Sequence, residues 1–250
     1  MVKLRLCGRA LGLIVCLAWP SVPARAMEVA LELILAVDCS ASVEAHEYTL
    51  QMRGIADAFR APEVVRAISA AAPNGIAVTL VQWSGVTMQV QVITWRRVHD
   101  AESANRLAAI IEASPRQIRW GATAIGEMLK FARRLFDDND FNGTRRVIDL
   151  SGDGSSNQGE FPTLARLPIV ASGIVINGLA ILNDEPTLDR YYRRQVIGGE
   201  RSFVLSARDF VDFANAIRRK LIREIGHPPS VRRGGRRLLN KRLAKGRSNN

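Results

Sequence analysis

Short apolar runs alternate with helix-patterned segments along most of this 250-residue chain, and this alternation limits the folds open to it. Six runs resemble β-strands: 31–38, 76–83, 87–94, 145–151, 173–182 and 201–207. The segments predicted as helices are 45–60, 62–71, 101–113, 124–136, 161–171, 187–196 and 208–225. Such alternation is typical of a mostly parallel sheet with helices on both faces. We therefore predict an α/β, doubly wound three-layer sandwich, in which 76–83 and 87–94 form a hairpin that adds one antiparallel edge strand.

The first 26 residues have the three parts of an export signal. Basic residues open the chain, an apolar run covers 10–19, and Ala24-Arg25-Ala26 fits a cleavage site. The apolar run is short for a membrane anchor, so cleavage is the favoured interpretation. We expect a mature chain that begins near Met27, is periplasmic or secreted, and has no transmembrane anchor. Only Cys39 would remain after cleavage, which excludes an internal disulfide.

The net charge of +11 belongs to the two ends of the chain. Of the 35 Lys and Arg residues, four lie in the signal and eight in 228–250, which leaves 23 against all 24 acidic residues. We interpret 228–250 as a solvated, disordered basic tail that follows a domain over 27–227. The alternative is an arm that contacts anionic lipid headgroups, cell-envelope polymers or nucleic acid, between which the tail does not discriminate. Nothing in the tail indicates a specific nucleic acid.

Oxygen-bearing side chains follow directly after the first predicted strand. The stretch D-C-S-A-S places Asp38, Ser40 and Ser42 just before a helix. In open α/β sheets, ligands bind beyond the carboxyl ends of the strands. Hard divalent cations take such oxygens, and Mg²⁺ prefers six of them. Because hydroxyls bring no charge, a cation held here would still attract an acidic partner.

D-x-S-x-S at the end of a first strand resembles the metal-ion-dependent adhesion site of von Willebrand factor A (VWA) and integrin I domains. That family adds a threonine after a glycine and before a helix, which WGATAIGEML supplies as Thr123. Its last member is an aspartate after the fourth strand, and VIDLSGDGSSN supplies Asp153. The resemblance covers about residues 30 to 225. Within the superfamily, the chain looks most like exported bacterial proteins with no assigned function.

The resemblance implies a role for each of these five residues. Ser40 and Ser42 would coordinate the cation directly, and Thr123 directly or through water. Asp38 and Asp153 would act mostly through waters. The cation would be Mg²⁺, with Mn²⁺ or Ca²⁺ possible, and the sixth position would take a carboxylate from a partner protein. In this family, ligand capture is sometimes coupled to movement of the last helix, which the sequence alone does not show.

The expected function is therefore an exported binding module and not an enzyme, since no nucleophile motif such as G-x-S-x-G is present. One alternative rests on GDGSSNQGE, which resembles the G-D-G-x-x-N-Q-G-E stretch of magnesium- and thiamine-diphosphate-dependent enzymes. The closing Asn pair of that motif is missing, and the motif explains neither D-C-S-A-S nor G-A-T. A further alternative is a scaffold whose basic tail binds anionic envelope polymers.

Single residues also have plainer interpretations. Ser40 or Thr123 alone would be a helix cap, and Asp153 alone a turn residue. Asp149, inside the fourth strand, is either a spare metal ligand or a buried carboxylate that faces a hydroxyl or a helix end. Trp120 lies three residues before Thr123, on the predicted binding face.

Overall fold

The structure is a computed structural model that describes residues 26–226. The predicted basic tail and all but the last residue of the predicted signal lie outside this range, so the structure does not test them. Within the range, no helix is both long enough and apolar enough to span a bilayer.

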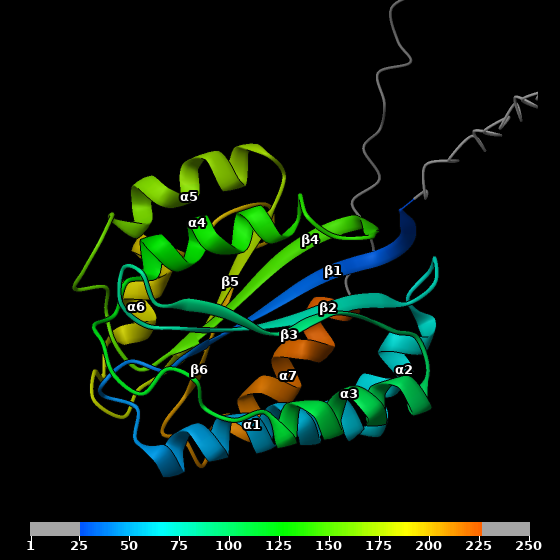
Figure 1. The fold of residues 1–250 in the computed structure, drawn as a ribbon, viewed down its shortest axis with the longest axis horizontal. Coiled ribbons are helices and arrows are strands. Elements are labelled where there is room, and N and C mark those ends of the chain that lie inside the picture. Colours follow the sequence, from blue (N-terminus) through cyan, green and yellow to red (C-terminus); the bar gives the residue numbers. More distant parts are fainter. Residues whose placement is uncertain (1–25, 227–250) are drawn as a thin grey trace, which may run out of the picture.

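A six-stranded sheet in the order β3-β2-β1-β4-β5-β6 forms the centre of the molecule (Figure 1). Neighbouring strands are parallel except β2 and β3, which form the antiparallel edge hairpin. The predicted sheet is confirmed. The strands are β1 (Met27–Asp38), β2 (Ile76–Trp83), β3 (Gln89–Val98), β4 (Phe141–Gly152), β5 (Val175–Ile181) and β6 (Val204–Ala207).

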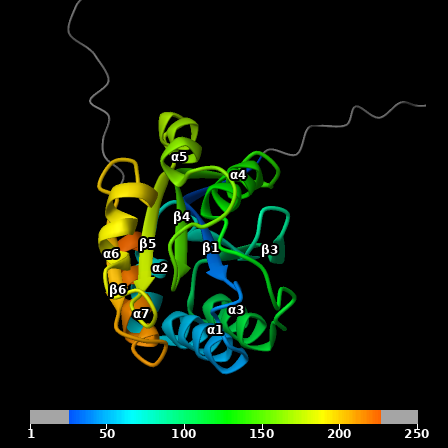
Figure 2. The ribbon, with the colours of Figure 1, turned by 90° about the vertical axis from the view of Figure 1, so that its left-hand side faces the viewer.

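Helices cover both faces of the sheet, as Figure 2 shows nearly end-on. One face packs against α1 (Ala45–Arg60), α2 (Pro62–Ala70), α3 (Ala101–Ala113) and α7 (Phe213–Ile225). The other packs against α4 (Ile125–Leu135), α5 (Pro162–Ala171), α6 (Leu188–Tyr191) and the π-helical turn η1 (Tyr192–Val196). Two apolar cores result, one on each side of the sheet.

The central strand β1 supplies side chains to both cores, which explains its apolar run from Leu33 to Val37. Leu33 and Leu35 face the core under α1 and α7, whereas Ile34 and Ala36 face the core under α4. A strand buried on both faces has no solvent side on which a polar residue would be favoured. The buried exceptions are Glu32, which pairs with Arg146 at 3.2 Å, and Asp38 at the carboxyl end of the strand.

Two predicted helices differ from the structure. The last helix begins at Phe213 and not at residue 208, so the prediction was wrong over 208–212. In that segment the Asp212 carboxylate accepts a hydrogen bond from the Arg208 amide, and the Asp209 carboxylate accepts one from the Asp212 amide. Such bonds from short acidic side chains compete with helical backbone bonds. The predicted helix over 187–196 is divided into α6 and η1.

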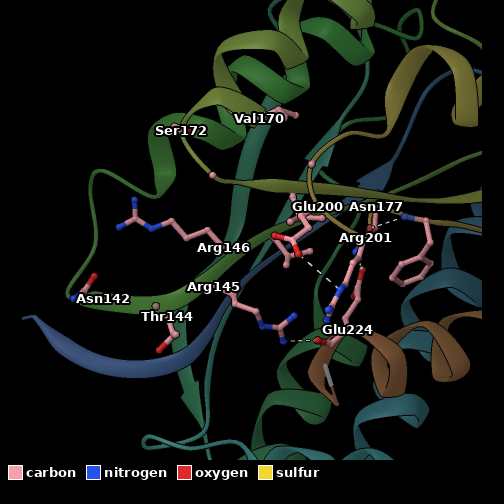
Figure 3. A pocket seen from close by; sticks show the side chains of 16 residues that line it. Asn142, Thr144, Arg145, Arg146, Val170, Ser172, Asn177, Glu200, Arg201 and Glu224 are labelled. Carbon is pink, nitrogen blue, oxygen red and sulfur yellow. Dashed lines mark hydrogen bonds and ion pairs between the residues drawn. The ribbon is translucent and has the colours of Figure 1, made fainter. Parts of the chain in front are cut away.

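A buried ionic cluster joins α7 to the sheet. Lys220, which is 0% exposed, contacts the Asp149 carboxylate of β4 and lies 2.7 Å from Glu224 Oε1. Asn177 of β5 donates to the same Glu224 oxygen at 3.0 Å. Figure 3 shows Glu224 and Asn177 in the wall of a cavity of about 730 Å³, where Arg145 donates to the Glu224 carbonyl. Asp149 is thus a partner of Lys220, and neither of its predicted roles is confirmed.

Candidate metal centre

The carboxyl ends of β1 and β4 lie side by side at the centre of the sheet. The chain runs from β1 to β2 on one side, and β4 is followed by β5 on the other, so the strand order reverses between them. This is the place where open α/β sheets form a crevice for ligands. Asp38 ends β1 and Asp153 comes directly after β4. The fold therefore brings together two carboxylates that are 115 residues apart in the sequence.

The D-C-S-A-S loop joins these carboxylates through its serines. The Ser40 amide donates to Asp38 Oδ1 at 2.7 Å. Ser40 Oγ lies 3.2 Å from Ser42 Oγ, which donates to Asp153 Oδ1 at 2.9 Å. Four of the five predicted residues thus form one connected chain of hydrogen bonds. Ser42 is exposed, so this chain of contacts opens to the surface.

Thr123 comes to the same place from the loop before α4. Gly121 has a φ of +118°, and a Cβ there would lie 2.3 Å from Ser84 Oγ, so the loop requires glycine. Its carbonyl accepts a hydrogen bond from the Ala41 amide at 3.0 Å, which ties this loop to the D-C-S-A-S loop. Thr123 Oγ1 lies 3.7 Å from the point where a Cβ on Gly154 would be, next to Asp153.

The stretch after Asp153 braces the threonine loop. Asn157 Oδ1 accepts from the Thr123 amide at 2.9 Å, and the Asn157 amide donates to the Thr123 carbonyl at 3.0 Å. Gln158 Oε1 accepts from the Val86 amide at 3.1 Å. The Asn and Gln that resemble a thiamine-diphosphate motif therefore connect loops of this site. The motif needs no cofactor to account for it.

The two aspartates lie in an environment that disfavours negative charge. Asp38 is 0% exposed and Asp153 is 1% exposed. Burial, followed by the charge of Asp153, raises the pKa of Asp38 to about 7. Burial also raises the pKa of Asp153, against the hydrogen bond from Ser42. Two ionised carboxylates buried this deeply favour a positive charge between them.

Unpaired oxygen atoms show that this donor set suits a hard cation. The Oδ2 atoms of Asp38 and Asp153 are both buried and have no hydrogen-bond partner among the described residues. The Tyr192 hydroxyl is buried and unpaired in the same way. A Cβ on Gly152 would lie 2.7 Å from Asp38 Oδ2 and 2.8 Å from Tyr192 Oη, so glycine keeps this space open. Carboxylates and hydroxyls, with no thiolate or imidazole among them, are the ligands that Mg²⁺ and Mn²⁺ accept.

Between residues 26 and 226, no group of three or more His, Cys, Asp or Glu side chains is placed to hold a metal ion. The hydroxyl-rich set agrees with this, because only two of its five members are carboxylates. Cys39 lies between two members but is buried in the core.

Arg116 was not predicted from the sequence, although it supports the D-C-S-A-S loop. Its guanidinium donates to the carbonyls of Val43 at 2.8 Å, Cys39 at 3.0 Å and Ser40 at 3.2 Å. It also donates to the carbonyl of Ile118 at 2.7 Å. The planar fork of arginine therefore fixes the backbone that presents Ser40. Arg116 lies in an irregular segment with no motif, so only the structure reveals it.

We expect Arg116→Met to weaken Mn²⁺ binding about tenfold, because groups that orient metal ligands typically contribute this much to affinity. Arg116→Lys should restore little, since lysine lacks the fork that reaches three carbonyls. Calorimetric titration with MnCl₂ measures the effect. The matched control is Arg119→Met, which removes a nearby arginine that has no bond to the loop. Unchanged affinity of Arg116→Met would contradict the supporting role.

A third carboxylate, also missed, lies beside the site. Glu185 Oε1 accepts from the amide and hydroxyl of Ser155 at 2.9 and 3.0 Å. It lies 3.7 Å from the point where a Cβ on Gly154 would be, the same distance as Thr123 Oγ1. Glu185 follows the carboxyl end of β5, where the rule that identified Asp38 and Asp153 also applies.

Exposed apolar side chains surround the site. Trp120 is 64% exposed and Phe161 is 73% exposed, and both belong to the loops that form the centre. Val86, which is 40% exposed, extends from the hairpin that Gln158 contacts. Trp120 is thus on the predicted binding face and is not part of a core.

Comparison with known proteins identifies a family and a fold. The sequence profile of the family described as "Protein of unknown function (DUF1194)" matches residues 28–229. No curated protein matches the sequence.

Several solved structures resemble the chain. Proximal thread matrix protein 1 from the mussel byssus is 18% identical with a TM-score of 0.57, over 82% of this chain and 48% of the mussel chain. A von Willebrand factor type A structure from Catenulispora acidiphila is 19% identical with a TM-score of 0.53, over 79% of this chain and 43% of that one. The pilus adhesin SpaC from Lactobacillus rhamnosus GG is 12% identical with a TM-score of 0.56, over 80% of this chain and 32% of the SpaC chain.

This chain spans about half the length of the mussel protein and less than half the length of the other two proteins. A further structure of the mussel protein has a zinc-occupied metal-ion-dependent adhesion site, at 17% identity and a TM-score of 0.54 over 80% of this chain and 48% of that one. At these identities the shared property is the fold. The chain folds as a VWA-like domain, and the similar structures include a byssal matrix protein and a pilus adhesin.

Proposed function

This chain belongs to the DUF1194 family of proteins of unknown function, and we propose that its VWA-like domain is a binding module that captures a protein partner through a divalent cation. One observation carries the proposal. Asp38 and Asp153 are joined through Ser40 and Ser42, and each keeps a buried carboxylate oxygen with no partner among the described residues.

The residues that would hold the cation are Asp38, Ser40, Ser42, Thr123 and Asp153. Mg²⁺ is the expected ion because all the donors are oxygens, and Mn²⁺ and Ca²⁺ accept the same set. When bound, the ion would supply a positive charge that attracts a carboxylate. Two carboxylates are enough to retain a divalent ion, and the hydroxyls add no negative charge that would repel an acidic ligand.

A protein ligand fits the surroundings better than a small molecule. The aromatic side chains of Trp120 and Phe161 are exposed beside the centre. Exposed aromatic groups around a polar centre are typical of protein–protein interfaces, where tryptophan often contributes much of the binding energy. We also propose that the protein acts after export, in the periplasm or outside the cell, on the basis of residues 1–26.

Relaxation of peptide protons by bound Mn²⁺ tests the proposal directly. A short Gly/Ser peptide with one Asp is added to the protein with MnCl₂, and an Asn peptide serves as its control. We expect the Asp side-chain protons to broaden and the Asn protons to stay sharp, because only a carboxylate would reach the ion. Asp153→Ala should remove the broadening. Equal broadening of both peptides, or none, would contradict metal-mediated capture.

A further inference from the structure

A second cavity lies beside the candidate metal centre, between α1 and the segment that follows α3. Its volume is about 860 Å³, and Val43 and Glu44 form part of its wall. These residues come directly after Ser42, and neighbouring Cα atoms are about 3.8 Å apart. A ligand that reaches the metal centre is therefore within a few residues of extended chain of this cavity.

Most charged groups around this cavity already have partners. The Glu44 side chain accepts from the first turn of α1 in a capping box. Glu112 pairs with Arg60 at 2.6 Å. Arg116 is engaged by the carbonyls of the D-C-S-A-S loop and lies over the Tyr48 ring, 5.9 Å from its centroid. None of these groups is available to a ligand without breaking an existing contact.

Arg53 and Arg119 are different. Both line the cavity and are exposed, and neither guanidinium group forms a hydrogen bond or ion pair with another residue in the part of the chain that the structure describes. The floor beneath them is apolar, because Val43 and Met52 are each only 2% exposed. An apolar floor under two unpaired guanidinium groups suits an acidic side chain, whose stem packs while its carboxylate pairs with arginine.

The opposite flank of the metal centre has the opposite charge. Asp184 and Glu185 follow β5, on the far side of β4 from β1. Asp184 is close enough for its charge to act on Asp153; Glu47 of α1 acts on it too, but its carboxylate is buried and already accepts a backbone hydrogen bond. A second acidic group on the ligand would be repelled on this flank and attracted on the flank with Arg53 and Arg119.

We propose that the cavity lined by Arg53 and Arg119 is a second anion subsite, which binds another carboxylate of the protein ligand whose first carboxylate binds the cation. The ligand would be an acidic segment with two carboxylates a few residues apart. This inference rests on the proposed function, because the metal centre would hold the first carboxylate.

The test compares short fluorescein-labelled Gly/Ser peptides with one Asp or with two Asp residues at varied spacing. Fluorescence anisotropy measures their binding to the full-length protein at low ionic strength, with MnCl₂ or with EDTA. In MnCl₂ we expect the best two-Asp peptide to bind about fivefold more tightly than the one-Asp peptide, as for two partly exposed ion pairs. The double variant Arg53→Ser/Arg119→Ser should lose this gain and keep its affinity for the one-Asp peptide and for Mn²⁺.

Arg194→Ser is the matched control, because it removes an exposed arginine on η1, away from the cavity. This control should keep the gain in affinity. The predicted basic tail is present in every variant, so a difference between variants does not come from the tail. In addition, the Arg Nε–Hε signals that disappear in the double variant should shift only with the two-Asp peptide.

The outcomes separate the two proposals. If one-Asp binding needs Mn²⁺ but the second Asp gives no gain, or the gain survives in the double variant, the subsite is wrong and the metal-mediated function stands. If EDTA does not weaken binding of the one-Asp peptide, the proposed function is wrong. The gain in affinity from the second Asp, measured in EDTA, then decides whether the subsite exists. If no peptide binds at millimolar concentration, both proposals are overturned.

Discussion

Asp153→Ala is expected to lower the affinity for Mg²⁺ by about 100-fold or more. The variant removes one of only two carboxylates that would face the ion. At an effective dielectric constant of 20, a unit charge about 4 Å away contributes about 4 kcal/mol, and each tenfold in affinity corresponds to about 1.4 kcal/mol. The full contribution of about 4 kcal/mol would correspond to a loss of more than about 100-fold. Part of this energy is offset because the removed carboxylate no longer has to be desolvated, and the expected loss of about 100-fold allows for this offset.

Thermal unfolding in MgCl₂ and in EDTA measures this loss. At a Mg²⁺ concentration about 100 times the Kd, binding stabilises the parent by about 2.7 kcal/mol. For a chain of this size, that corresponds to a rise in Tm of roughly 5–10 °C. Asp153→Ala, with an affinity about 100-fold weaker, should show a rise of no more than about 2 °C. In EDTA its Tm should stay near that of the parent, because losing the hydrogen bond from Ser42 is offset by relief of repulsion with Asp38.

Asp184→Ala is the matched control for this experiment. It removes an exposed carboxylate of the same face that forms no hydrogen bond with any of the five predicted ligands and acts on Asp153 only through its charge. The Mg²⁺-dependent rise should persist in this control. A full rise in Asp153→Ala would contradict the assignment of the site.

The second large effect is expected where α7 packs on the sheet. Lys220→Met should destabilise the fold by about 3–5 kcal/mol, the range for removing one partner of a buried ion pair. Lys220 is 0% exposed and is the cation between Asp149 and Glu224. Without it, two buried carboxylates face each other, and α7 loses its polar contact with β4. Urea denaturation at neutral pH measures the free energy of unfolding.

The matched control is Lys130→Met, because Lys130 also contacts two carboxylates but at the surface. Its amino group lies 2.7 Å from Glu127 and 3.1 Å from Glu160, and its side chain is 44% exposed. Exposed pairs contribute about 0–1 kcal/mol, so this variant should be nearly as stable as the parent. Equal losses in the two variants would show that the buried cluster does not stabilise the fold.

The loss in Lys220→Met should also depend on pH. Burial, followed by the charge of Glu224, raises the pKa of Asp149 well above its ordinary value of 3.8. An acid whose pKa is raised in the folded state destabilises the fold least below its unfolded-state pKa. Its destabilising effect grows as the pH rises from the unfolded-state pKa to the folded-state pKa. Removing Lys220 removes a charge that opposes this rise. The deficit of the variant should therefore shrink as the pH falls towards 3.8, and a deficit that does not change with pH would contradict this mechanism.

Local patterns predicted the sheet and the residues at its carboxyl edge. The apolar run of β1 ends at Asp38, where the strand leaves the core. The rule that ligands bind where parallel strands end then selected Asp38 and Asp153 among 24 acidic residues. The stretch D-C-S-A-S added Ser40 and Ser42 in the loop after Asp38, the family pattern added Thr123, and the fold places all five at one edge.

Contacts between distant elements could not be predicted in this way. The pairing of Lys220 with Asp149 depends on how α7 is rotated and shifted on β4, which no periodicity in either segment specifies. Arg116 lies in an irregular segment, and its partners are backbone carbonyls that carry no sequence signal. The error at 208–212 has a local cause, because Asp209 and Asp212 bond to backbone amides where the apolar spacing predicted a helix.

Calorimetric titration of the full-length protein with MnCl₂, repeated with MgCl₂, tests the central claim most directly. The account predicts that one cation binds per chain, that Mg²⁺ competes with Mn²⁺ for the same site, and that Asp38→Ala and Asp153→Ala each remove the binding. Absence of cation binding to the parent at millimolar concentration, or undiminished binding to both variants, would contradict it.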